Sequence, residues 1–397
     1  MASGPDMRLD DRPVRGTRPG NRRELIVVAA AKLFYAKGFA RTSMGEIAEA
    51  VSIGPSALYR HFRGKGELLT TVVDESIISV RGLLEGLGPD RFGQLSGLLA
   101  PVLLEHREMG VMWRRESRNL DEEVRARAHD QIRAIAGILA EVIEEGRQDL
   151  GADDAAFLAS CLLGVATSIS FHQLTLPEEQ FTELLASMLD GVLTTSLPAG
   201  VLDPDSSPML LAPRKSRRED LLAAAIRLFS EDGYAKVGME DIGAAVGIAG
   251  PSVYSHFGSK AELLIAGTVR ATEWLRMDLA QALARATDPE DGLRRLLLSY
   301  SAFALANPHM VDLLVTELDQ LPAEDRLRAR QSQLDYIAEW VHLLRAVHTE
   351  LDAVTARILV QATLSMMNDV ALIPRLRARG GLCAEMAAVG ERLLALH

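Results

Sequence analysis

The sequence predicts an all-α protein made of two related halves, and three observations support that fold class. No segment of the 397 residues alternates apolar and polar residues with the period of two that a half-buried strand shows. Long segments instead repeat apolar residues every three or four positions, with glycine and proline between them. Residues 22–69 align with residues 217–264 without a gap, at 21 identities in 48 positions. A repeat of this length that occurs twice indicates a duplicated domain and not a solenoid.

The apolar periodicity predicts nine helices in each half. In the first half they cover residues 21–37, 44–51, 55–61, 65–86, 90–105, 107–118, 121–148, 153–173 and 178–196. In the second half they cover residues 216–232, 239–246, 251–256, 259–286, 288–306, 308–319, 322–348, 352–370 and 378–396. The helix at 121–148 illustrates the pattern, because its apolar residues recur at spacings of three and four and Asp121 is suited to its N-cap.

Two segments lack this periodicity and divide the chain. Residues 1–20 are rich in Arg, Asp, Pro and Gly, which predicts a disordered basic arm. Residues 197–215 contain four of the 16 prolines, which predicts an interdomain linker. The predicted domains are therefore a head at 21–66 with a body at 67–196, and a second head at 216–261 with a body at 262–397.

The composition is that of a soluble globular protein, with 48% hydrophobic and 24% charged residues. Two cysteines are too few for a disulfide scaffold or a paired-cysteine zinc site, and their sparing use predicts a cytoplasmic protein. The first 20 residues have no apolar segment of the kind found in signal peptides. Residues 155–177 contain no charged residue, but serine, threonine, histidine and glutamine interrupt them, so we interpret them as a buried helix and not a membrane span.

The formal net charge of −11 disfavours a protein that coats nucleic acid, but the charge is unevenly distributed. Residues 8–65 contain 12 Lys and Arg against 5 Asp and Glu, whereas residues 213–260 contain 7 against 6. These segments carry local charges of +7 and +1, and the rest of the chain carries −19. A small basic head on an acidic body is the pattern that any function must explain.

Two short predicted helices in each copy are joined by a tight turn. In the first copy the turn is Ser52–Ile53–Gly54 and the second helix starts at Pro55. In the second copy the turn covers 247–250 and the second helix starts at Pro251. Two short helices across a glycine-containing turn are typical of a helix-turn-helix, whose second helix presents its N-terminal residues to the major groove of DNA.

Polar residues of these helices are candidates for the DNA face. Tyr59 and His61 are expected to bond phosphates, Lys65 to attract a phosphate to the start of the next helix, and Arg60 to reach a base. The candidate DNA-binding residues are Arg22, Arg41, Thr42, Ser43, Ser56, Ala57, Tyr59, Arg60, His61, Arg63, Lys65, Arg217, Ser252, Tyr254, Ser255, His256 and Lys260. The competing interpretation is that a short helical pair is simply part of a core. The repeat and the local charge favour DNA binding over that interpretation.

Both heads resemble the N-terminal head of the TetR/AcrR family of bacterial transcription regulators. The resemblance is carried by AAAKLFYAKGFARTSMGEIAEAVSIGPSALYRHFRGKGELL in the first copy and AAAIRLFSEDGYAKVGMEDIGAAVGIAGPSVYSHFGSKAELL in the second. It implies that the first three helices of each copy read double-stranded DNA, the fourth connects, the next three enclose a ligand pocket and the last two dimerise.

One feature departs from this resemblance, because ordinary members carry one head and form homodimers. This chain holds two full copies, like the tandem regulators of actinobacteria that it resembles. The helices that the resemblance assigns to dimerisation are residues 153–196 and 352–396. We therefore expect them to meet inside one chain, as an intramolecular pseudo-dimer.

Aromatic and methionine residues at helical spacing in the bodies are candidates for the wall of the implied pocket. They are Phe92, His106, Met109, Met112 and Trp113 in the first copy, and Trp274, Tyr300, Phe303, Met310 and Trp340 in the second. The competing interpretation is that each is ordinary core. Few charges fall among them, which predicts an apolar small-molecule effector.

No catalytic, phosphate-binding or metal-ligand motif stands out, so neither an enzyme activity nor a cofactor or metal is expected. The predicted function is a sequence-specific transcriptional regulator, a repressor relieved by an apolar small molecule, whose two heads read two half-sites. One alternative is a helical binding module in which head 2 is a degenerate scaffold and only head 1 contacts DNA. A helical carrier or an enzyme of another type is the third hypothesis.

Overall fold

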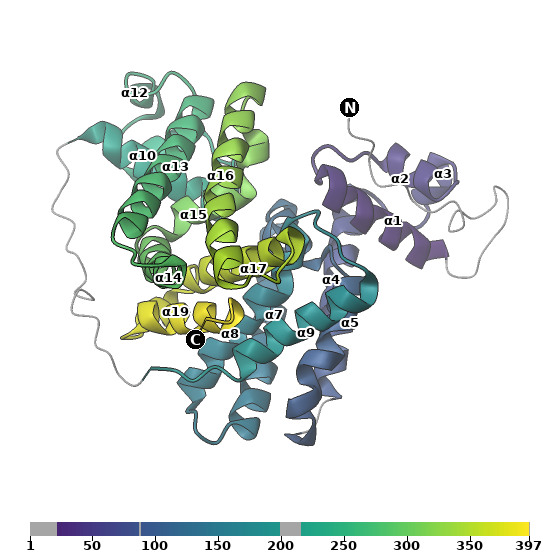
Figure 1. Cartoon of the computed structure of the whole chain (residues 1–397). Helices are drawn as coiled ribbons and strands as arrows, with labels where there is room; N and C mark the ends of the chain where they lie inside the picture. The colour runs from purple at the N-terminus through teal and green to yellow at the C-terminus, as the bar shows by residue number, and fades with distance from the viewer. Residues whose placement is uncertain (1–21, 87–88, 199–215, 397) are drawn as a thin grey trace. The chain divides into compact units, whose positions relative to one another are not determined.

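The computed structural model describes residues 22–86, 89–198 and 216–396, and every regular element in these ranges is a helix (Figure 1). The predicted all-α fold class is therefore confirmed. The predicted arm at 1–20 and nearly all of the predicted linker at 197–215 lie outside the described residues.

The order of helices is the same in the two copies. The first copy contains α1 (Arg22–Lys37), α2 (Met44–Ala50), α3 (Pro55–Leu58), α4 (Lys65–Glu85), η2 (Pro89–Gln94), α5 (Leu95–Glu105), α6 (Met109–Arg114), η3 (Glu116–Asn119), α7 (Glu122–Gly146), α8 (Ala152–Ser168), η4 (Ile169–Phe171) and α9 (Glu178–Leu193). The second contains α10 (Arg217–Asp232), α11 (Met239–Ala245), α12 (Gly250–Val253), α13 (Lys260–Ala284), α14 (Pro289–Ala306), α15 (Pro308–Thr316), η5 (Leu318–Gln320), α16 (Ala323–Val347), α17 (Ala353–Ala371), α18 (Pro374–Arg377) and α19 (Leu382–Leu393).

Some predicted helices are shorter or interrupted in the structure. The predicted helix at 378–396 is present as α19 but shorter, because Gly381 adopts a left-handed φ of +82° and α19 starts only after it. The predicted segments 90–105 and 107–118 each contain a 3₁₀ turn, η2 and η3. The second helix of the first motif ends as an α-helix at Leu58, although the Phe62 amide still donates to the Leu58 carbonyl at 3.1 Å.

The chain divides into two compact units that cut across the first copy. The first unit contains the first head with α4, α6, η3 and most of α7. The second contains α5, the end of α7, α8, α9 and the whole second copy. The last two helices of the first copy therefore fold together with the second copy.

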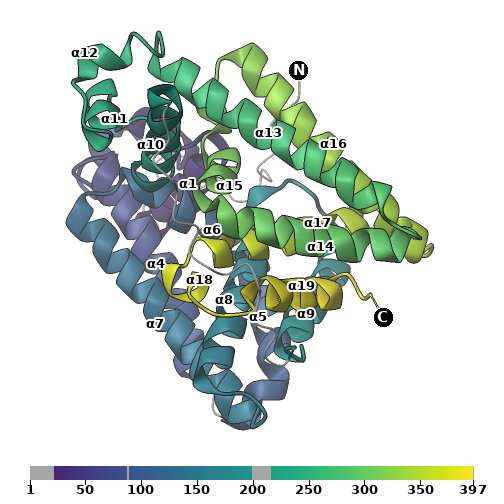
Figure 2. The same cartoon turned by 90° about the vertical axis from the view of Figure 1, so that its left-hand side faces the viewer.

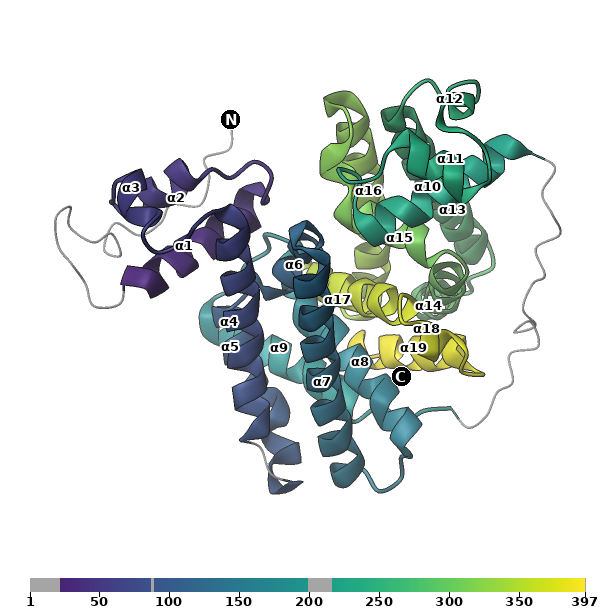
Figure 3. The same cartoon turned by 180° about the vertical axis from the view of Figure 1, so that it is seen from behind.

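Helix α8 packs along α17 within the second unit, and Figures 2 and 3 show both beside α19. The α8 residues Ala155 and Ala159 are fully buried, and their small side chains allow two helices to approach closely. An ion pair fastens one end of this interface, where Arg379 bonds Asp154 of α8 and donates to Glu385 at 2.6 Å. Helix α9 packs on α19, where Arg392 donates to the Thr194 hydroxyl at 3.4 Å.

The apolar segment in the first copy is largely buried. Among the described residues, one helical stretch, Ala152–Phe171, is long and apolar enough to cross a membrane by length and composition. Within its most apolar window 72% of the residues are buried, and the helix packs against α17. This packing accounts for the apolar composition that the sequence shows.

Candidate nucleic-acid interface

The first helix of each motif is held by local hydrogen bonds. Ser43 is the N-cap of α2: the Glu46 amide donates to its hydroxyl at 3.2 Å, and the Ser43 amide donates back to the Glu46 carboxylate at 2.8 Å. Lys37 also donates to Glu46 at 2.7 Å. These bonds hold the pKa of Glu46 down at about 2, with the Lys37 bond as the largest cause. In the second copy Gly238 replaces the serine, and only its backbone N–H donates, to Asp241 at 2.7 Å.

The turn between the two helices needs a residue in the left-handed region. Ser52 has a φ of +56°, and Gly247, the aligned residue of the second copy, has a φ of +73°. Glycine adopts this conformation without a steric penalty, whereas a residue with a Cβ pays for it. The first copy therefore carries a strained residue at a position where the second copy does not.

Helix α3 turns its apolar residues inward and its polar residues outward. Leu58 and Phe62 are at most 1% exposed and hold the helix against the core of the head. Tyr59 is 54% exposed, and Arg60 beside it is exposed as well. The outward side also carries four more of the predicted DNA-binding residues. Ser56, His61 and Arg63 are exposed, and Ala57 is half-buried.

The second motif repeats this arrangement with fewer cations. Val253 and Phe257 are buried, and Tyr254 is 55% exposed. Ser255, aligned with Arg60, is exposed, and its hydroxyl donates to the Ser252 carbonyl at 2.7 Å. Ser252 is exposed and His256 is half-buried, while Gly258 takes the place of Arg63. The outward face of α12 is thus nearly neutral where that of α3 is basic.

Two predicted phosphate ligands also hold the head together. The Lys65 ammonium donates to the carbonyls of Phe39 at 2.6 Å and Thr42 at 2.9 Å, and lies 4.3 Å from the centre of the Phe39 ring. Lys260 does the same in the second copy, with the Tyr234 carbonyl at 2.7 Å and the Val237 carbonyl at 2.9 Å. These donors point at the loop before α2 or α11, so both lysine side chains also have a structural role in the head. The phosphate contacts expected of both lysines and of the backbone N–H groups at the starts of α4 and α13 stay predictions.

Thr42, another of the predicted DNA-binding residues, is buried. Its side chain is 2% exposed, and its hydroxyl donates to the Gly38 carbonyl at 2.9 Å, so it faces the core and not a ligand. The other predicted cations lie at the rim of the heads. Arg41 is exposed and donates to the Lys37 carbonyl at 2.7 Å, and Arg217 is exposed and donates to the Val246 carbonyl at 3.1 Å. Arg22 is half-buried at the start of α1.

Two arginines outside the candidate DNA-binding set, Arg23 and Arg218, brace the motifs. The Arg23 guanidinium lies 5.0 Å from the centre of the Phe62 ring and bonds Glu75 at 3.0 Å. Arg218 lies 3.8 Å from the Phe257 ring centre and also contacts Glu262 at 3.5 Å. The sequence signal for these contacts is that an arginine and a phenylalanine occur at aligned positions in both copies. These contacts tie α1 or α10 to the segment that follows the second helix of the motif.

Four of the five predicted pocket residues of the second copy, Trp274, Tyr300, Phe303 and Trp340, lie in one aromatic cluster. Trp113 is 8% exposed, and its indole N–H donates to the Ser76 hydroxyl at 2.8 Å, which makes it a core residue of the first unit. Met109 and Met112 are buried, and Phe92 and His106 are half-buried. In the second copy Tyr300, Phe303 and Trp340 are buried together, Met310 is buried, and Trp274 is half exposed.

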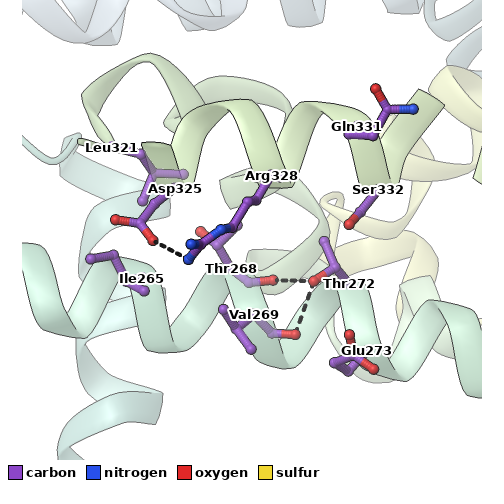
Figure 4. Close-up of a pocket in the computed structure, with 11 residues that line it drawn as sticks. Ile265, Thr268, Val269, Thr272, Glu273, Leu321, Asp325, Arg328, Gln331 and Ser332 are labelled. Atoms are coloured by element: carbon purple, nitrogen blue, oxygen red, sulfur yellow. Dashed lines mark hydrogen bonds and ion pairs between the residues drawn. The ribbon is translucent and has the colours of Figure 1, made fainter. Parts of the chain in front are cut away.

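A groove of about 410 Å³ lies between α13 and α16 in the second unit (Figure 4). Its lining mixes apolar, hydroxyl and charged side chains, among them Ile265, Thr268, Val269, Thr272, Leu321, Asp325, Arg328 and Ser332. The Thr272 hydroxyl donates to the Thr268 carbonyl at 3.1 Å, and Arg328 lies 3.9 Å from Asp325. None of the ten predicted pocket residues lines this groove.

Comparison with known proteins identifies the two heads. Residues 26–72 and 221–266 each match the family described as bacterial regulatory proteins, tetR family. Two segments of the chain, in tandem, therefore match this one family model. The matches coincide with α1 to the start of α4 and α10 to the start of α13, the segments that build the two motifs.

Two curated relatives each match less than a quarter of the chain. The HTH-type transcriptional activator FasR of Mycolicibacterium smegmatis is 37% identical over 91 residues, which are 23% of this chain and 42% of FasR. The HTH-type transcriptional regulator LmrA of Bacillus subtilis is 35% identical over 85 residues, which are 21% of this chain and 45% of LmrA. The matched stretch is thus less than half of either relative. A TetR-family transcriptional regulator from Bordetella parapertussis is 20% identical, with 46% of this chain and 94% of that one covered and a TM-score of 0.41.

Proposed function

We propose that the chain is a cytoplasmic, DNA-binding transcriptional regulator whose two heads read the two half-sites of one operator. The observation that carries the proposal is the repeated outward face: Tyr59 and Arg60 in the first head, Tyr254 and Ser255 in the second, each fixed by a buried apolar partner in the next turn. Exposed residues on a helix of this length and placement reach base edges and phosphates of a major groove. The two tetR-family matches support this function.

The two heads bind unequally in this proposal. Head 1 presents Arg60 and Arg63, and head 2 presents Ser255 and Gly258 at the aligned positions. A bidentate arginine–guanine contact contributes about 1–3 kcal/mol of discrimination, and serine bonds either base type. The operator is therefore an imperfect palindrome, with the more stringent half-site under head 1.

The α8–α17 packing supports an internal pairing of the two copies. In the proposal it replaces the interface that homodimeric relatives form between chains, so one chain supplies both heads. An apolar small molecule then relieves repression by binding better to the conformation that cannot hold DNA, because equal affinity for both conformations would change nothing.

The test uses DNA selected from a random library by the full chain, with binding followed by fluorescence anisotropy over a series of salt concentrations. Replacing both Arg60 and Arg63 with alanine is expected to weaken binding and to lower the log–log salt slope by about 0.9, because the expected phosphate contact of Arg63 contributes about that much, whereas Arg60 is expected to read a base. The control replaces Arg127 and Arg133 of α7, which are exposed outside the heads, and should change neither value. Equal effects of the two double variants would contradict the proposal.

A further inference from the structure

The body of the second copy contains a buried aromatic cluster, formed by Tyr300 and Phe303 of α14 with Tyr336 and Trp340 of α16. The ring centre of Tyr300 lies 6.1 Å from the ring centre of Tyr336 and 6.3 Å from that of Trp340. The ring centres of Tyr336 and Trp340 are 6.3 Å apart. The Tyr300 hydroxyl donates to the Asn368 side-chain oxygen of α17 at 2.8 Å. This hydroxyl is therefore satisfied within the protein.

Two polar atoms of the same cluster have no hydrogen-bond partner. They are the Tyr336 hydroxyl and the Trp340 indole N–H, on side chains that are 7% and 0% exposed. Burial raises the pKa of Tyr336 well above its usual value, and the nearby Trp340 N–H opposes this only in part, without the geometry of a hydrogen bond. A buried polar group without a partner destabilises the folded protein, so such a pair in a core calls for an explanation.

The first copy has no such atoms at the equivalent positions. Helices α7 and α16 are both 25 residues long, and in this register Tyr336 and Trp340 correspond to Ile135 and Leu139. Both of these aliphatic residues are at most 2% exposed. Counted back from the last residues of α5 and α14, Tyr300 corresponds to Leu99. The duplicated core is therefore aliphatic in one copy and aromatic with orphan polar atoms in the other.

The groove between α13 and α16 lies on the same two helices (Figure 4). Ser332 lines it and precedes Tyr336 by one helical turn, so the two side chains share a face of α16. Thr268 and Thr272 line it from α13. The same helix carries Trp274, whose ring centre lies 5.7 Å from that of Phe303. The groove therefore shares helices α13 and α16 with the contacts of the aromatic cluster, although no residue of the cluster lines it.

We infer that the second copy, and not the first, holds the effector site, and that the effector is a neutral, mainly apolar molecule with an oxygen that accepts a hydrogen bond. The indole N–H of Trp340 only donates, so its partner must be an acceptor. The inference rests on the proposed function, because it names the class of effector of that regulator and the copy that binds it.

The charges around the cluster favour a neutral ligand over an anion. None of the four aromatic residues is charged, and the carboxylate that acts on Tyr336 is that of Asp278, which also accepts a hydrogen bond from Ser299. A carboxylate ligand would be desolvated there without a cation and would face a negative group. A ketone, ester or alcohol oxygen would satisfy the orphan donors without that cost.

The experiment follows Trp340 as the sole tryptophan, in a chain with Trp113→Phe and Trp274→Phe, since the sequence holds three tryptophans. The probes are three ketones of increasing size, acetophenone, benzophenone and androst-4-ene-3,17-dione, each paired with its oxygen-free analogue: ethylbenzene, diphenylmethane and 5α-androstane. At least one ketone should change the Trp340 emission saturably and bind about three- to tenfold more tightly than its hydrocarbon. Calorimetry on the unaltered chain repeats the comparison in case the background substitutions disturb folding.

Two variants assign the effect to the orphan atoms. Tyr336→Phe should reduce the preference of the ketone over the hydrocarbon to the share that the Trp340 N–H supplies, and without ligand its melting temperature should equal or exceed that of the parent. Tyr300→Phe is the matched control, because it removes a hydroxyl that already has a partner: it should lower the melting temperature and keep the ketone preference. The inference is overturned if no ketone binds in preference to its analogue, or if Tyr336→Phe leaves that preference intact. Because these measurements contain no DNA, a failure of DNA binding would be seen separately.

Discussion

Gly164 of α8 lies against Met366 of α17 so closely that a Cβ on the glycine would come within 2.7 Å of the Met366 Cα. The two helices belong to different copies, so this contact joins the halves of the duplicated chain inside the second unit. A nearby hydrogen bond, from the Thr167 hydroxyl to Asp369 at 3.3 Å, shares the same interface. Residue 164 therefore sets how near the helices approach.

Gly164→Ala should destabilise the protein by about 1–3 kcal/mol, because the added methyl group meets backbone that has to move. The control is Gly137→Ala on the exposed side of α7, where a Cβ would have nothing within 4 Å. There the change should stabilise by about 0.5–1 kcal/mol, since alanine favours a helix interior. Chemical unfolding of both variants checks the pair, and equal effects would show that the α8–α17 approach is not tight.

The strained turn gives a prediction with opposite signs in the two heads. Ser52→Gly should raise the stability of the first head by about 1 kcal/mol, because glycine adopts the positive φ at no steric cost. Gly247→Ser should lower that of the second head by a similar amount. Thermal unfolding of the two variants measures both, and a loss of stability in Ser52→Gly would mean that the serine makes a compensating contact.

The structural role of Lys65 separates stability from DNA affinity. Lys65→Met should cost about 1–3 kcal/mol of stability, because the Phe39 and Thr42 carbonyls lose a charged donor. It should change the salt slope of DNA binding much less than Arg63→Ala, for which we expect a drop of about 0.9. If Lys65→Met instead lowered the slope as strongly as Arg63→Ala, the ammonium would be a phosphate ligand after all.

The capping box of α2 predicts an acid-sensitive first head. The pKa of Glu46 in the folded protein is about 2, below its usual value of 4.5. Its contribution to stability is therefore complete above pH 4.5 and is lost as the pH falls toward 2. Unfolding measured between pH 5 and 2.5 should show a weaker pH dependence for Glu46→Gln than for the parent protein. Parallel pH profiles would contradict this role.

The parts that were predictable from sequence are those set by local pattern. The periodicity and the glycine-containing turns are encoded within a few residues, and the structure places them as expected. The role of Trp113 was not predictable, because its partner Ser76 lies 37 residues away and only the tertiary fold brings them together. The same holds for Lys65, whose acceptors lie more than 20 residues earlier. The break before α19 did leave a signal, the pair of glycines that ends at Gly381.

The central claim is that one chain places two unequal heads on one operator, and the stoichiometry of the DNA complex tests it most directly. Sedimentation with a hydroxyl-radical footprint on the same selected duplex should give one 43.2 kDa chain per duplex. It should also give two protected half-sites. The half-site that is better protected with the parent protein should be the one that loses protection in the Arg60→Ala, Arg63→Ala variant. Two chains per duplex with one head each on the DNA, or a single protected half-site with head 2 as a scaffold, would contradict the account.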